Sequence, residues 1–309
     1  MQSKYLKTII ARNIRFEEKS HTYWDEENNL YTSATQLIGK VTPEFDTVNI
    51  AIKYAKRHGQ TAQYWIEEWE RIKNEACTRG NYHHDSLETG IDKINNEYWD
   101  KEAKNIGIYE MSTNTNIFNR YNRRVNYTEL EHSPIRTAYP VIYARLVELI
   151  KAGWELYAEK IVYWAEFYVA GKIDLLAINP LTREFIIIDW KTNKDDLKFK
   201  SGYFKKENGI KTTIWVDKDE RLKFPLDHIQ HCKGNGYILQ LSLYARMMEN
   251  LGYSLTGIEL YHIRDIGITL YTLPYWRAEV EQLALAHAGK NNKVKSDTSV
   301  PKSLFGIKK

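Results

Sequence analysis

Cysteine is scarce in this chain of 309 residues. The two cysteines, Cys77 and Cys232, lie far apart and do not form the spacing pattern of a disulfide framework. Two are also too few for a four-cysteine iron–sulfur cluster. We therefore expect no iron–sulfur cofactor and no dependence on an oxidising compartment.

Long apolar runs are also absent. No stretch approaches the roughly 18 to 20 apolar residues that a membrane-spanning helix requires, and residues 1–20 lack the apolar region of a secretory signal. These absences predict a cytoplasmic protein with no membrane partner. The net charge of +4 is modest and gives only slight support to a polyanionic partner.

Residues 166–192 are the most informative stretch that is present. Two apolar runs, residues 167–178 and 185–190, flank the turn sequence Asn-Pro-Leu-Thr-Arg, which predicts a buried β-hairpin. Three ionisable residues interrupt these runs: Asp174, Asp189 and Lys191. Buried charges are costly unless they are paired or bind a metal, so this pattern indicates either a structural salt bridge or an active site.

The alternation of side chains along a strand favours the active site. It places Asp189 and Lys191 on the same face, and closing the hairpin brings Asp174 to the same place. Two adjacent carboxylates attract a hard cation such as Mg²⁺ or Mn²⁺. A lysine beside that cation can stabilise developing negative charge or orient an attacking water.

This arrangement resembles the PD-(D/E)XK phosphodiesterase superfamily. Ile173-Asp174 stands where the family has Pro-Asp, and Asp189-Trp190-Lys191 forms the second half of the motif. The resemblance implies that Asp174 and Asp189 bind the metal, with the backbone carbonyl of Trp190 as a further ligand. It also implies that Lys191 is catalytic.

An earlier segment matches the RecB-like group of this superfamily, which carries R-G-T-x-x-H-x-x-L-E ahead of the hairpin. The chain has Arg79-Gly80 at the start of this pattern, with Asn81 in place of threonine and His84 at the histidine position. The resemblance implies that His84 is a metal ligand. The alternative is a solvated helical residue, and the neighbouring His83 competes for the same assignment.

Two further features resemble this group. Glu166 stands where RecB-like sequences have an acid before the hairpin, which implies that it binds a metal through water or positions a ligand; a surface ion pair is the alternative. Gln240 and Tyr244 match the family's Q-x-x-x-Y motif on a predicted helix. In the family these two residues line the site and help to orient DNA or the lysine.

The chain is basic after the hairpin, where it could contact a phosphate backbone or form a solvated loop. This segment contains Lys194, Lys198, Lys200, Lys205, Lys206 and Lys211, and a small hairpin is expected at residues 214–224. A second basic group, Arg120, Arg123 and Arg124, leaves the same two alternatives open.

The resemblance implies an α/β fold with a mixed sheet, a restriction-endonuclease-like core with helices on both faces. The expected parts are an N-terminal hairpin and helical region (1–78), a nuclease core (79–288) with an insertion at about 90–135, and a basic, flexible tail (289–309). Within the first part, Thr32 or Ser33 can cap a helix that begins near Ala34. A new helix is expected to begin at Arg79.

The function implied is a DNA exonuclease that uses one or two Mg²⁺ or Mn²⁺ ions and acts on DNA ends. A phage or prophage enzyme of recombination or replication is expected, with proteins of those processes as partners. The alternatives are a structure-specific DNA endonuclease, a catalytically silent nucleic-acid-binding module, and a structural protein with a salt-bridged hairpin.

Overall fold

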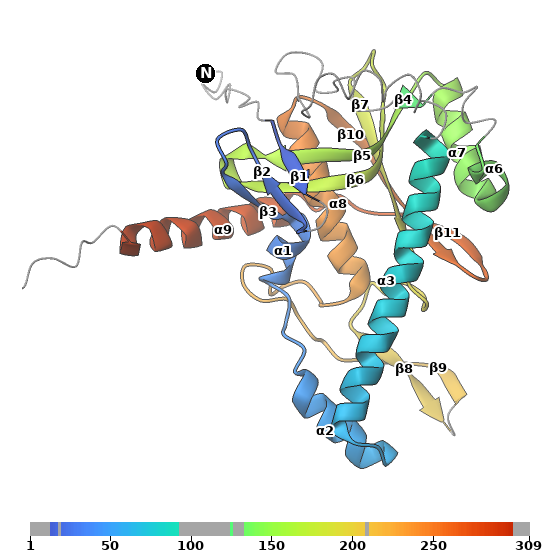
Figure 1. Ribbon diagram of the computed structural model, residues 1–309, viewed down its shortest axis with the longest axis vertical. Coiled ribbons are helices and arrows are strands. Elements are labelled where there is room, and N and C mark those ends of the chain that lie inside the picture. The colour runs from blue at the N-terminus through green and yellow to red at the C-terminus, as the bar shows by residue number, and fades with distance from the viewer. Residues whose placement is uncertain (1–12, 18–19, 93–123, 126–132, 208–209, 299–309) are drawn as a thin grey trace, which may run out of the picture.

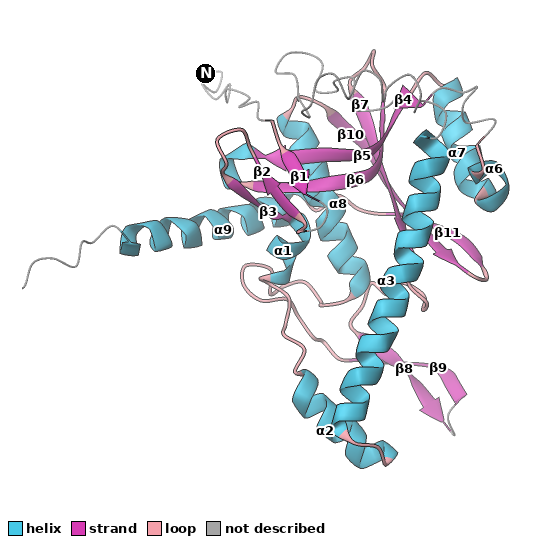
Figure 2. Ribbon diagram, viewed as in Figure 1, coloured by secondary structure: helices cyan, strands magenta, loops and turns pink. Residues whose placement is uncertain are grey.

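The computed structural model describes residues 13–17, 20–92, 124–125, 133–207 and 210–298. Within these residues the protein is a mixed α/β fold built on a nine-stranded sheet (Figure 1, Figure 2). The predicted fold class is therefore confirmed. The strands of this sheet are β1 (Arg15–Glu17), β2 (Thr22–Trp24), β3 (Leu30–Ser33), β4 (Arg124–Val125), β5 (Glu155–Trp164), β6 (Val169–Ile178), β7 (Glu184–Lys191), β10 (Ser254–Arg264) and β11 (Gly267–Thr272).

A separate two-stranded sheet pairs two strands that follow β7 in the sequence. These are β8 (Gly202–Glu207) and β9 (Ile210–Asp217). The helices are α1 (Ala34–Gly39), α2 (Thr47–His58), α3 (Ala62–Asp92), α6 (Ile135–Ala138), α7 (Pro140–Lys151), the 3-10 helix η1 (Ala165–Phe167), α8 (Lys233–Asn250) and α9 (Arg277–Thr298). None of the helices in the described ranges combines the length and apolarity needed to cross a membrane.

The predicted β6–β7 hairpin is the centre of the sheet, and both of its faces are buried. Leu175 and Ala177 belong to a core formed with α7 and the C-terminal half of α3, whereas Leu176 and Ile178 belong to a core formed with α8. Strands covered by helices on both faces read as nearly continuous apolar runs. Each fully buried Leu or Ile contributes roughly 1.5–3 kcal/mol, so this hairpin anchors both layers.

Strand β6 changes partner along its length. Its C-terminal half pairs with β7, and this ladder ends at the Leu175–Ile188 pair. Its N-terminal end pairs with β3 instead, through Val169 and Ala170. The other edge of β6 pairs with β5 throughout. The sheet therefore forks between β3 and β7, and Asp174 lies at the point where β7 leaves β6.

The N-terminal hairpin follows the sequence-based expectation. Strands β2 and β3 pair around a turn at residues 25–29, and β3 joins the main sheet beside β6. Ser33 caps α1, since its hydroxyl accepts a hydrogen bond from the Gln36 backbone N–H and the Gln36 side chain binds the Ser33 backbone in return. This reciprocal arrangement satisfies two backbone donors at the helix start.

Three sequence-based boundaries differ from the structure. No helix begins at Arg79, because α3 is continuous from Ala62 to Asp92 and crosses the expected 78/79 domain boundary. A single glycine inside a helix costs only about 1 kcal/mol, so Gly80 does not interrupt it. The hairpin expected at residues 214–224 is instead β8–β9, which turns earlier.

The remaining expectations concern the insertion and the tail. Most of the insertion expected at 90–135, including Arg120 and Arg123, lies outside the described residues. Helix α9 continues to Thr298, so the expected tail begins inside a helix.

Gly171 of β6 provides a test of how tightly the α8 layer packs. A Cβ atom at this position would lie 2.2 Å from the Cε1 atom of Tyr244, which is a buried ring on α8. Overpacking of this kind typically costs about 1–3 kcal/mol. We expect Gly171→Ala to lower the free energy of unfolding by about that amount in urea denaturation.

Gly257→Ala in β10 is the matched control, because no heavy atom lies within 4 Å of its Cβ position. We expect it to change the free energy of unfolding by less than about 0.5 kcal/mol. Equal effects of the two substitutions would contradict the close packing of Tyr244 on Gly171.

Candidate metal centre

The fork between β6 and β7 brings two buried carboxylates together. The β6–β7 register places Asp174 opposite Asp189, one position beyond the last paired residues. In place of the missing ladder bond, the backbone N–H of Trp190 donates to Asp174 Oδ2 at 3.1 Å. The Asp174 carboxylate is thus fixed by the backbone of the neighbouring strand.

Asp189 and Lys191 project from the same face of β7, as the alternation of strand side chains requires. Lys191 Nζ lies 2.6 Å from Asp189 Oδ2, and the Asp189 side chain is only 1% exposed. The ammonium group also lies 5.2 Å from the ring centroid of Tyr237 on α8. An acid–lysine pair therefore stands beside Asp174, as the hairpin pattern predicted.

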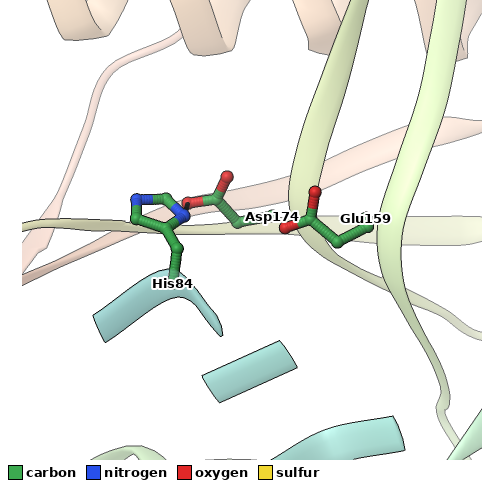
Figure 3. Close-up of side chains that lie close together, drawn as sticks. All are labelled: His84, Glu159 and Asp174. Carbon is green, nitrogen blue, oxygen red and sulfur yellow. Dashed lines mark ion pairs between the residues drawn. The ribbon is translucent and has the colours of Figure 1, made fainter. Parts of the chain in front are cut away.

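Two more side chains complete the cluster. Glu159 of β5 lies opposite Asp174, because the pairs Ala158–Leu175 and Lys160–Ile173 flank it in register. His84 of α3 approaches from the helical side, with Nδ1 3.6 Å from Asp174 Oδ2. Figure 3 shows the imidazole and the two carboxylates directed toward one another, and each residue offers a ligand atom within 4.8 Å of the others.

The position of α3 explains why His84, and not His83, enters the site. Arg79 Nη2 donates to the Thr192 carbonyl at 3.2 Å, just beyond β7. A Cβ at Gly80 would lie 3.4 Å from Thr192 Oγ1, so the helix approaches the strand closely at this glycine. His83 points elsewhere and binds the Tyr139 hydroxyl at 2.9 Å.

The acids of the cluster have strongly perturbed pKa values. Burial, with the nearby Asp174 charge, raises the pKa of Asp189 to about 7. Burial and the same charge raise the pKa of Glu159 to about 8. Burial also raises the pKa of Asp174 above its usual range. A cation placed among these groups would reverse the shifts, because it favours the ionised carboxylates.

The pKa values of the two basic groups of the site, Lys191 and His84, are shifted in opposite directions. Burial disfavours the charged form of Lys191, but Asp189 and Asp174 outweigh it and raise the lysine pKa. Burial and the Lys191 charge lower the pKa of His84. At neutral pH the ammonium therefore stays charged while the imidazole is neutral, which is the form that ligates metals.

Glu159 is held in an unusual backbone conformation. Its φ is 51°, in the left-handed region that few residues other than glycine adopt, and its carboxylate forms an ion pair with Lys172 of β6. Such conformations cost on the order of 1–3 kcal/mol and tend to occur at functional sites. The residue with this unusual backbone conformation is thus the acid that lies opposite Asp174.

The donor set fits a divalent cation. Ligand atoms around Mg²⁺ bind at about 2.1 Å and lie within roughly 4.2 Å of one another, so a small contraction would suffice to bring the His84, Glu159 and Asp174 atoms into coordination. Oxygen donors predominate, which suits Mg²⁺ or Mn²⁺. Asp189 adjoins this group, although its carboxylate is directed to Lys191.

Glu166 is not part of the cluster, contrary to its predicted role. It is exposed in η1, at the turn that joins β5 to β6. Asp174 lies five residues beyond the start of β6, which is roughly 16 Å along a strand. Glu159 takes the place expected for Glu166. Its signal in the sequence is an acid inside the apolar strand of residues 155–164, the same signal that marks Asp174.

The two residues of α8 that the sequence motif predicted, Gln240 and Tyr244, lie beside the cluster of acids. Tyr244 is buried near Asp174 and Asp189, whose charges affect its pKa, although burial is the largest cause of its rise. Gln240 Nε2 donates to the Tyr244 hydroxyl at 2.9 Å. Lys191 is contacted by Tyr237, which the motif missed; a helical stripe at 237, 240 and 244 would have revealed it. Trp190 meets the site through its N–H, which donates to Asp174, and through its ring, which lies edge-on to His84 at a centroid distance of 6.4 Å.

Comparison with known proteins adds little to this geometry. No protein-family model and no curated protein matches the chain. Among solved structures, the crystal structure of SSO0001 is similar at 17% identity, over 58% of this chain and 78% of that chain, with a TM-score of 0.24. A likeness this distant carries no information about activity.

The raised pKa values predict that metal binding depends on pH. Glu159 and Asp189 must lose protons to ligate a cation. The affinity for Mn²⁺ should therefore rise between about pH 6 and pH 8.5, by up to about tenfold per pH unit for each proton released. Calorimetric titration in buffers of different ionisation enthalpy would count these protons, and a pH-independent affinity would contradict the assignment.

The metal-free protein should show the opposite trend in stability. Above the histidine pKa of about 6.5 in the unfolded chain and up to the folded-state values of about 7 and 8, Asp189 and Glu159 bind more protons in the folded protein than in the unfolded chain, where their pKa values are about 4. Its free energy of unfolding should consequently fall as pH rises through this range. Thermal denaturation with a chelator measures this trend, and Mn²⁺ should oppose it.

Glu159 and Glu166 can be separated by substitution. We expect Glu159→Gln to weaken Mn²⁺ binding about tenfold or more, since one of the clustered ligand atoms is lost. Glu166→Gln should leave binding within about twofold of the native value, given the distance along the strand. A larger loss for Glu166→Gln than for Glu159→Gln would restore the sequence-based assignment.

Proposed function

We propose that this protein is a metal-dependent deoxyribonuclease that hydrolyses phosphodiester bonds, and that it acts as an exonuclease from DNA ends. The observation that carries the proposal is the meeting of Asp174, Asp189 and Lys191 with His84 and Glu159 at the fork of the sheet. A salt-bridged structural hairpin would not require the additional imidazole and acid beside Asp174.

The residues of the chain would divide the chemistry. His84, Glu159, Asp174 and Asp189 would hold one or two divalent ions, which supply activation of a water molecule and neutralisation of phosphate charge. Lys191, kept charged by its two acidic neighbours, would stabilise the charge that develops on the phosphate. Trp190 fixes the direction of the Asp174 carboxylate through its N–H.

The choice of exonuclease rests on the similarity of the four motifs to RecB-like sequences. A structure-specific endonuclease would use the same residues, and the two activities differ in their requirement for a DNA end. As partners of such a nuclease we propose proteins of DNA recombination or replication.

Substitution of the hairpin residues tests the proposal. We expect Asp189→Ala and Lys191→Ala each to lower the rate of DNA cleavage with Mg²⁺ or Mn²⁺ by about 100-fold or more, as is typical for loss of one charge-stabilising group. The measurement is release of label from an end-labelled linear duplex. Circular dichroism should show an unchanged fold.

Glu70→Ala and Lys73→Ala are the matched controls, because both residues are exposed on the N-terminal half of α3. Their rates should remain within about twofold of the native rate. Undiminished cleavage by both hairpin variants would refute the catalytic assignment. Cleavage of closed-circular DNA at the linear rate would favour the endonuclease.

A further inference from the structure

A large concavity lies apart from the acidic cluster. It has a volume of about 1280 Å³, which exceeds the roughly 300–1,000 Å³ of small-molecule sites. One wall is α2, and the other is the chain from residue 195 to β8 together with Trp215 of β9. We call it the basic cleft. Its lining residues are Tyr54, Arg57, Asp195, Asp196, Leu197, Lys198, Phe199, Lys200, Tyr203, Phe204, Lys205, Lys206 and Trp215.

The charge of the basic cleft is strongly one-sided. Five of its lining residues are basic and two are acidic. One of the acids, Asp196, is engaged by Arg264, a residue outside the lining. Lysine and arginine side chains spaced along a groove are the groups that contact successive phosphates.

Aromatic rings are interleaved with these cations. Tyr203 is 46% exposed and Tyr54 is 38% exposed. Tyr54 is held edge-on to Trp65 and Trp69 of α3, at centroid distances of 5.3 and 5.4 Å. Trp215 lies edge-on to Phe204 at 5.0 Å. Rings fixed in this way can stack on unpaired bases, which a duplex keeps hidden.

The basic cleft begins close to the acidic cluster. Asp195 is the fourth residue after Lys191, a span of at most about 14 Å. The intervening segment is tied to α8, since the Tyr237 hydroxyl donates to Asn193 Oδ1 at 2.7 Å. The same Tyr237 ring lies beside Lys191. A strand leaving the candidate centre along this segment would enter the cleft within a few nucleotides.

We propose that the basic cleft binds single-stranded nucleic acid, with its cations on the phosphates and Tyr54 and Tyr203 stacked on bases. The binding site itself follows from the charge and the rings. Its assignment to the strand being cleaved rests on the proposed nuclease function.

The test is binding of a fluorescent 20-nucleotide thymidine oligomer to the full chain, measured by anisotropy with a chelator so that no cleavage occurs. The variant Arg57→Ala/Lys200→Ala/Lys206→Ala removes three lining cations. We expect at least about tenfold weaker binding, and a salt dependence whose slope on logarithmic axes is shallower by about 2.

The control variant is Lys53→Ala/Lys56→Ala/Lys73→Ala. It removes the same charge from exposed positions that do not line the cleft, and its affinity should stay within about threefold of the native value. Equal loss in the two triple variants would overturn the proposal, since the effect would then be one of net charge. Unchanged binding by the cleft variant would overturn it as well.

The aromatic part has its own variant. Tyr54→Ala/Tyr203→Ala should weaken the binding of the single-stranded oligomer about fivefold or more, and should leave the affinity for a duplex of equal length within about twofold of the native value. Equal loss for both nucleic acids would exclude stacking on unpaired bases. If poly-glutamate displaces the labelled oligomer as effectively as unlabelled oligomer of the same total charge does, the cleft is a general polyanion site and the proposal is overturned.

This experiment is independent of catalysis. If the native protein binds the oligomer through the basic cleft but cleaves no DNA with Mn²⁺, the proposed binding site stands and the proposed nuclease function is refuted. If the native protein cleaves DNA but the cleft variants bind the oligomer normally, the nuclease function stands and the proposed binding site is refuted.

Discussion

One side-chain contact organises the centre of this protein: the Asp174 carboxylate accepts the Trp190 backbone N–H at the point where β7 leaves β6. A backbone donor that lost its ladder partner inside the core would cost on the order of 1–3 kcal/mol. The carboxylate satisfies that donor and lets the strands separate. The fork and the acid therefore depend on each other, because the opening that admits other ligands exists only where Asp174 replaces a strand partner.

The same contact concentrates negative charge at the fork. Three carboxylates, the buried Asp174 and Asp189 and the half-buried Glu159, share the fork with the ammonium groups of Lys172 and Lys191. Each lysine pairs with one outer acid, and Asp174 lies between them. Pairing limits the cost of burial, yet the pKa values of Glu159 and Asp189 remain raised. The charge balance of the fork is thus incomplete in a way that one added cation would correct.

The sequence predicted the parts of this centre that depend on local periodicity. Alternation along residues 169–178 and 184–191 placed Asp174, Asp189 and Lys191 correctly relative to one another, and helical periodicity located α8. The acid on β5 could not be chosen this way. Glu159 and Glu166 both precede the hairpin, and only the pairing of β5 with β6 decides which one faces Asp174. Register between strands is a tertiary property.

A similar limit applies to α3 and to the basic cleft. The sequence of α3 contains a motif that suggests a new helix at Arg79, but contact with Thr192 makes Gly80 a point of close approach within one helix. The lysines after Lys191 are visible as a basic run. Whether that run is a solvated loop or one wall of a cleft depends on α2, which lies more than 100 residues earlier in the chain.

The continuity of α3 links the two regions mechanically. The helix rests on the Thr192 carbonyl at Arg79, with His84 about 7.5 Å beyond that point and the start of the helix about 26 Å on the other side, at 1.5 Å per residue. The distant half packs against α2, which forms a wall of the basic cleft. The C-terminal half, which carries His84, packs into the core through Leu87 and Ile91. These core contacts and the hydrogen bond from Arg79 to Thr192 hold the imidazole at the fork, and the same helix reaches the wall of the cleft with its other half.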